Sequence, residues 1–106
     1  MLPWHHRTML HGKAMRYLRS LGHELSPIVQ IGKEGLTEGV VQATSRALLD
    51  HELIKVKVGT EAPEGRKDTL ATLAKSTTAE LVQVLGRTGL LYKKHPESPR
   101  IQLPAR

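Results

Sequence analysis

The sequence contains no cysteine and no phenylalanine, and aromatic residues make up only 3% of its 106 residues. Without cysteine there is no disulfide, no thiolate zinc site and no thiol catalysis. With so few large rings, the core must be built from Leu, Val, Ile and Ala. No apolar run approaches the roughly 20 residues that a membrane helix needs, and the N-terminus lacks the apolar centre of a signal peptide. We therefore expect a soluble, cytoplasmic protein.

Acidic residues are also scarce, because 10 Asp and Glu stand against 16 Lys and Arg, which leaves a net charge of +6. A chain of this length forms one domain with a single modest core. An excess of positive charge favours a polyanionic partner, and nucleic acid before a membrane surface.

The sequence lacks the patterns of a catalytic or metal centre. No two of its six histidines are spaced i and i+4 on one predicted helix. Asp50, His51 and Glu52 are contiguous, but they lie at a helix-to-strand junction, where polar residues usually serve as caps and turns. We expect no catalytic residue, no metal, no cofactor and no small-molecule substrate, and hence no enzyme.

Hydrophobic periodicity predicts a helix over residues 11–21, a short buried strand over 28–31 and a helix from Thr37 to about His51. A strand over 53–58, a helix over 66–76 and strands over 81–85 and 90–93 follow. The predicted core faces of the first two helices consist of Ala14, Tyr17, Leu18 and Leu21, and of Val40, Ala43, Thr44, Ala47 and Leu48. This order, α-β-α-β-α-β-β, predicts a single compact α/β domain with a mixed four-stranded sheet and packed helices. Residues 1–10, with Trp4, are expected to be a flexible N-terminal arm, and residues 95–106 an extended tail.

Lysines and arginines gather in three places. On the first helix, Lys13, Arg16 and Arg19 share an arc of roughly 120°, opposite the core face. On the strand over 53–58, Lys55 and Lys57 alternate with three apolar residues, so this strand has one cationic side. Gly86-Arg87-Thr88-Gly89 reads as a hairpin turn, and Arg87 with Lys93 and Lys94 is expected to form a further basic cluster.

The motif that joins these elements is Gly32-Lys33-Glu34-Gly35, between the first strand and the second helix. Two glycines three residues apart permit a tight loop and the close approach of an anionic backbone. Lys33 adds a cation, and the first N–H groups of the following helix favour phosphate. The loop lacks the Gly-Lys-Ser/Thr ending of a Walker motif, and it lacks the third glycine of a dinucleotide-binding fingerprint. It therefore predicts a phosphate-backbone contact.

Three blocks of the sequence resemble one family. Residues 32–39 (GKEGLTEG), 51–58 (HELIKVKV) and 82–92 (VQVLGRTGLLY) are similar to the CRM domain, the chloroplast RNA splicing and ribosome maturation family, in its stand-alone bacterial YhbY-like form. The resemblance covers residues 11–104. It implies a fold similar to the C-terminal domain of translation initiation factor three, with a glycine loop like that of KH domains, which clamps nucleic-acid backbone. The role of this loop carries onto Gly32, Lys33, Glu34 and Gly35, although the carboxylate of Glu34 departs from an ideal phosphate loop.

The resemblance and the charge together predict a monomeric RNA-binding protein that acts in assembly of the large ribosomal subunit and binds ribosomal RNA. One alternative is a protein-interaction module that docks on a ribosomal protein through an apolar patch of Trp4, Ile101 and Leu103. A DNA-binding protein is a weaker alternative, because Arg46 is the only basic residue of the second helix.

Overall fold

The computed structural model describes residues 10–105, and within them the chain forms three helices and four strands. Their bounds are α1 (Gly12–Gly22), β1 (Pro27–Ile31), α2 (Glu38–His51), β2 (Leu53–Val58), α3 (Arg66–Ser76), β3 (Glu80–Leu85) and β4 (Thr88–Tyr92). The predicted order of elements is thus confirmed. Trp4 and most of the predicted N-terminal arm lie outside the described residues.

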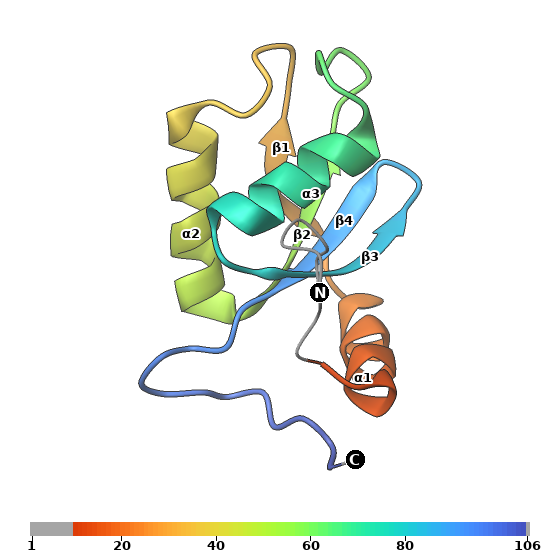
Figure 1. The fold of residues 1–106 in the computed structure, drawn as a ribbon, viewed down its shortest axis with the longest axis vertical. Helices are drawn as coiled ribbons and strands as arrows, with labels where there is room; N and C mark the ends of the chain where they lie inside the picture. Colours follow the sequence, from red (N-terminus) through yellow and green to blue (C-terminus); the bar gives the residue numbers. More distant parts are fainter. Residues whose placement is uncertain (1–9, 106) are drawn as a thin grey trace, which may run out of the picture.

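The four strands form one mixed sheet in the order β1-β2-β4-β3. β1 runs parallel to β2, whereas β4 runs antiparallel to both β2 and β3. Helices α2 and α3 pack on one face of the sheet, and α1 lies at one end of the molecule on the opposite face (Figure 1). The loops after β1 and β2 lie together at the other end.

Alternation along β2 divides the core into two parts, since successive side chains of a strand point to opposite faces. Ile54, Val56 and Val58 are buried with the side chains of α2 and α3. Leu53 faces the other way and packs with Leu18 of α1. Lys55 and Lys57 share the face of Leu53, but α1 covers only the part of that face around Leu53, Leu90 and Tyr92. The rest of the α1 face of the sheet is open.

Three residues predicted to be buried are exposed. Tyr17 is 39% exposed and Ala43 is exposed, because each lies about 100° around its helix from the buried centre, marked by Leu18 in α1 and Thr44 in α2. Ile28 is 53% exposed because β1 is an edge strand, and Ile28 points to the open face while Val29 and Ile31 face α2.

The turn between β3 and β4 is shorter than predicted. Only Gly86 and Arg87 connect the strands, and Gly86 has a left-handed φ of +58°. Thr88 and Gly89 belong to β4, where a Cβ on Gly89 would lie 2.7 Å from the side chain of Leu70. Gly89 therefore lets α3 approach the sheet and is not part of the turn.

The C-terminal residues run along the domain and are held by the carboxylate of Glu52, which is fully buried. Its oxygens accept hydrogen bonds at 2.8 Å from the backbone N–H groups of His95, Arg100 and Ile101. Burial alone raises the pKa of Glu52, but these three hydrogen bonds and the charge of Arg100 outweigh it, so that the pKa lies below its ordinary value. Burial, and then the charge of Glu52, raise the pKa of the neighbouring Tyr92.

Candidate nucleic-acid interface

The Gly32 loop is a tight turn with its charged residues at the tip. The Gly35 N–H donates to the Gly32 carbonyl oxygen at 2.9 Å, and Lys33 and Glu34 between them are exposed. Gly35 has a φ of +72°, and a Cβ there would lie 3.1 Å from the ring of Pro63 in the loop after β2. Its backbone angle and this packing both require glycine at residue 35.

Gly32 is under neither constraint. A Cβ at Gly32 would meet no atom within 4 Å, and its φ lies outside the left-handed region. The fold therefore does not require a glycine at residue 32. What its missing side chain does provide is bare, exposed backbone at the edge of a cleft.

This cleft has a volume of about 660 Å³ and lies between the Gly32 loop, the end of β2 and the turn before β4. Lys57 and Arg87 are its cations. Arg87 is held in place because its Nε donates to the Val58 carbonyl oxygen at 2.8 Å and its Nη2 to the Gly59 carbonyl oxygen at 2.7 Å. The structure therefore brings both glycine motifs to one cleft, which the sequence could not show.

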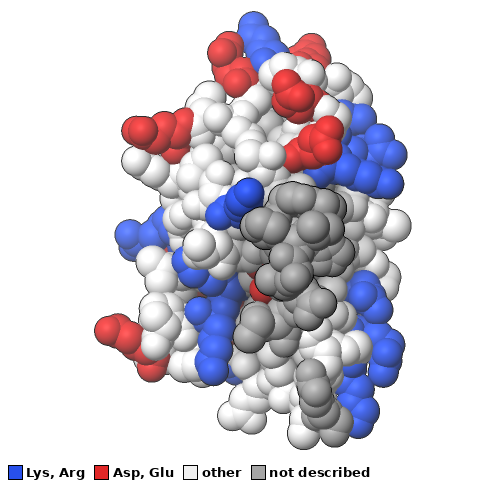
Figure 2. All heavy atoms as spheres, viewed as in Figure 1, with Lys and Arg blue, Asp and Glu red and all other residues white. Residues whose placement is uncertain are grey.

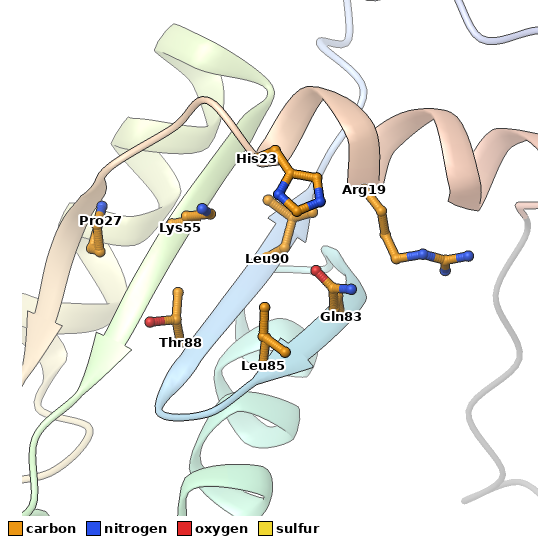
Figure 3. Close-up of a pocket in the computed structure, with 9 residues that line it drawn as sticks. Arg19, His23, Pro27, Lys55, Gln83, Leu85, Thr88 and Leu90 are labelled. Atoms are coloured by element: carbon orange, nitrogen blue, oxygen red, sulfur yellow. The ribbon is translucent and has the colours of Figure 1, made fainter.

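A second, smaller hollow continues along the same face of the sheet. Lys55, two residues before Lys57 on β2, lines it together with residues from α1, β3 and β4 (Figure 3). It encloses about 170 Å³ beside Arg19, Gly22, His23, Pro27, Gln83, Leu85, Thr88 and Leu90. Since residues i and i+2 of a strand lie on the same face and roughly 7 Å apart, the two hollows are neighbours along β2. We call the two hollows together the sheet groove.

The basic side of α1 borders the sheet groove. Arg19 lines the smaller hollow, and Lys13 and Arg16 are exposed on the preceding turns. A Cβ on Gly22 would lie 2.7 Å from Leu90, so this glycine allows the C-terminal end of α1 to lie close to β4. The predicted stripe of cations thus leads into the groove.

Acidic side chains gather at the opposite end, around the Gly32 loop. Glu34 lies at the tip, Glu38 in the first turn of α2, and Glu61 and Glu64 in the loop after β2, all of them exposed. Figure 2 shows most of the red side chains of this view at this end of the molecule, while blue ones are spread over both sides and also occur at this end. Glu61 also lines the larger cleft, whereas no acidic residue lines the smaller hollow, so a polyanion is attracted more strongly to α1 and the smaller hollow than to the tip of the Gly32 loop.

Lys93 and Lys94 do not cluster with Arg87, contrary to the prediction. Arg87 precedes β4 and Lys93 follows it, so the two are separated by the length of the strand, about 20 Å. The Nζ of Lys93 donates to the Thr77 carbonyl oxygen at 3.0 Å, at the C-terminal end of α3, where a cation is favoured by the helix dipole. Lys94 is exposed beside it.

Sequence reasoning missed His23, Gln83 and Thr88 as residues of the sheet groove. They come from three different parts of the chain and have no common spacing. A register shift between Leu81 and Gln83 also breaks the alternation of β3, since Val82 packs with the cluster under α1 and Val84 against the main core, so the sequence pattern does not give the orientation of Gln83. Among residues 10–105, no group of three or more His, Asp or Glu side chains is arranged to hold a metal ion. No helix in the same range has the length and hydrophobicity to cross a membrane.

Comparison with known proteins gives a consistent result. The CRS1 / YhbY (CRM) domain model matches residues 10–93. The Probable RNA-binding protein YqeI of Bacillus subtilis is 42% identical over 96 residues, covering 91% of this chain and all of YqeI. The RNA-binding protein of Haemophilus influenzae is 40% identical, over 92% of this chain and 97% of its own length. The solution structure of a hypothetical protein from Staphylococcus aureus superimposes with a TM-score of 0.76 at 43% identity, over 91% of this chain and all of that one. This chain belongs to the CRS1 / YhbY (CRM) domain family.

Proposed function

We propose that this protein binds RNA along the sheet groove, with phosphates held by the cations of β2, α1 and the β3–β4 turn. The observation that carries the proposal is the groove itself, in which Lys55, Lys57, Arg87 and Arg19 from three parts of the chain line two neighbouring hollows. The names of the relatives in Bacillus subtilis and Haemophilus influenzae support RNA as the polyanion.

Each part of the surface has a distinct task in this proposal. Lys57 and Arg87 bind a phosphate in the larger cleft, where the bare backbone of Gly32 allows the sugar-phosphate chain to come close. Lys33 adds a contact at the tip of the loop, with the carboxylate of Glu34 turned away from the RNA. Lys13, Arg16 and Arg19 extend the contact along α1. Lys94 lies at the far end of β4 and contacts only an RNA that wraps around the domain.

The finer proposal is that the RNA is ribosomal RNA of the large subunit and that the protein acts on its precursor as a monomer. Its support is the resemblance of residues 32–39, 51–58 and 82–92 to the ribosome-maturation family.

The test is binding to fragments of large-subunit ribosomal RNA by variants that remove one charge each. Lys57→Ala and Arg16→Ala should each weaken binding about threefold to tenfold, while Lys75→Ala should leave it unchanged. Lys75 is the matched control because it is an exposed lysine in the last turn of α3, on the other face of the sheet. Equal binding by all three variants would exclude the groove, and tighter binding to unrelated RNA would exclude the ribosomal target.

A protein-interaction module remains the second candidate, and one observation favours it. The patch expected from Ile101 and Leu103 does not form, because both side chains are partly buried against the core beneath α1. Ile101 instead lines an apolar hollow of about 460 Å³ beside the exposed Ile28 of the edge strand β1. Loss of ribosome association by Ile28→Asp, with RNA binding unchanged, would favour this candidate.

A further inference from the structure

We propose that the smaller hollow of the sheet groove binds a single unpaired nucleobase, so that this surface recognises a base as well as phosphates. This inference rests on the proposed function, because the base arrives as part of the bound RNA. Because the chain has so few aromatic residues, other side chains must provide the stacking surface for this base.

The lining of the hollow is chemically mixed in the way that a base requires. Leu85 and Leu90 supply an apolar side, and Leu85 is 65% exposed although it is a large aliphatic residue. Arg19 of α1 and His23, the residue that follows α1, line the other side, and the Arg19 guanidinium is directed away from Leu85 and Leu90 (Figure 3). Imidazole rings and guanidinium planes both stack on bases, so His23 and Arg19 can take the part that Phe or Tyr plays in other RNA-binding surfaces.

Hydrogen-bonding groups lie between these two sides. The amide of Gln83 offers a donor and an acceptor together, which matches the amino group and ring nitrogen of adenine, and the hydroxyl of Thr88 can do either. The last carbonyl oxygens of α1 accept hydrogen bonds from the backbone of the following turn, those of Ser20 and Gly22 from His23 and Leu25. Side chains are therefore the main polar groups that α1 and the strands present to a ligand in the hollow.

Size and charge indicate a nucleotide as the occupant. The volume of about 170 Å³ has room for one planar ring but not for a helix or a strand of another protein. Two cations, Arg19 and Lys55, line the hollow, and no acidic residue does so. They match the phosphates on either side of a flipped-out base, and Lys57 and Arg87 lie further along the groove to receive the continuing backbone.

The inference is tested with an RNA hairpin that carries one bulged adenosine, the same hairpin with an abasic ribose at the bulge, and the fully paired hairpin. The protein should bind the bulged adenosine at least about fivefold more tightly than the abasic site, which keeps the phosphates and lacks only the base. Leu85→Ser and Gln83→Leu should bring this ratio close to one without weakening binding to the abasic hairpin. Lys57→Ala should weaken binding to both hairpins equally and leave the ratio unchanged.

The outcomes separate this inference from the proposed function. Equal binding of the wild-type protein to the bulged and abasic hairpins would overturn the base pocket and leave RNA binding in place. A ratio that survives in both Leu85→Ser and Gln83→Leu would overturn it too, because the base would then bind elsewhere. No binding to any hairpin at low salt would overturn both. Thermal unfolding of each variant checks that it is folded, which we expect for Leu85→Ser because residue 85 is mostly exposed.

Discussion

Gly32 and Gly35 begin and end the same turn, yet they serve different purposes. Gly35 is held at a φ of +72° against Pro63, whereas Gly32 has an ordinary backbone angle and open space around it. Gly35→Ala should therefore lower the free energy of unfolding by about 1–2 kcal/mol, from the cost of the left-handed conformation alone. In a domain of this size, that is a fall in Tm of roughly 4–16 °C.

Gly32→Ala is the matched control, and it should change the free energy of unfolding by less than about 0.5 kcal/mol. Its effect should instead appear in RNA affinity, since a methyl group there obstructs the approach of the sugar-phosphate chain. Urea unfolding of both variants, followed by RNA titration of Gly32→Ala, separates the two roles. If Gly32→Ala and Gly35→Ala lowered the free energy of unfolding equally, residue 32 would be as constrained as residue 35.

Glu52 is the residue on which the C-terminal segment most depends. Glu52→Gln keeps the shape of the side chain, but its amide nitrogen cannot accept the hydrogen bond from the backbone of His95 or Arg100. In the variant, a buried hydrogen bond to a charged group is replaced by two donors that face each other. We therefore expect the free energy of unfolding to fall by about 2 kcal/mol at pH 7. Urea unfolding at pH 7 measures it.

The same carboxylate predicts a pH dependence. The pKa of Glu52 in the folded protein lies below its ordinary value of 4.5, so its ionised form stabilises the fold above that pH. As the pH falls below about 4.5 and through the lower folded pKa, this stabilisation is lost. The difference between the wild type and Glu52→Gln should therefore shrink in acid. A difference that stays constant from pH 7 to pH 3 would contradict this assignment.

Among the elements, the contact between α3 and the sheet depends on Gly89. The side chain of Leu70 occupies the space that a Cβ on Gly89 would need, at 2.7 Å. Gly89→Ala should force α3 away from β4 and lower the free energy of unfolding by about 1–3 kcal/mol, the usual cost of overpacking. Thermal unfolding beside Gly32→Ala tests this, and equal melting temperatures would show that Leu70 can move aside without cost.

The bounds of the three helices could be predicted from local signals, but the burial of residues within the elements only in part. The second helix was predicted to begin at Thr37, and the Thr37 hydroxyl caps α2 by accepting the hydrogen bond from the Val40 N–H. Ile28 looks like a core residue in sequence, and only the position of β1 at the edge of the sheet leaves it exposed. Gly89 likewise resembles a turn residue until Leu70, 19 residues earlier in the chain, is seen above it.

The candidate site likewise contains parts that one segment of the sequence predicts and parts that depend on contacts between distant segments. The Gly32 loop and the stripe on α1 are each contained in one segment, so their spacing was sufficient to find them. The groove needs Arg19, Lys55 and Arg87 on the same face of the sheet, in two neighbouring hollows, and this depends on the strand order, which places β4 between β2 and β3. Glu52 was considered only as part of a polar junction, because its partners lie more than 40 residues away.

Across the whole molecule, acidic side chains are concentrated at one end of the long axis, although lysines and arginines occur at both ends. The carboxylates of Glu34, Glu38, Glu61 and Glu64 surround the loop end, and the cations of α1 lie at the other. In the proposed mode of binding, the RNA runs from α1 along the sheet groove and meets the Gly32 loop last. Its affinity should depend more on Arg16 and Lys57 than on Lys33, even though Lys33 lies in the most conspicuous motif of the sequence.

This arrangement predicts the salt dependence of binding. If about five phosphates are neutralised, by the lysines and arginines of α1 and β2, the logarithm of the association constant should fall with the logarithm of salt concentration with a slope of roughly −3.5 to −4.5. Lys57→Ala should make this slope shallower by about 0.7–0.9, because one phosphate contact is removed, and Lys75→Ala should not change it. A slope near zero for the wild type would mean that the groove binds its partner without neutralising phosphates. The apolar hollow beside Ile28 would then be the surface that binds a partner.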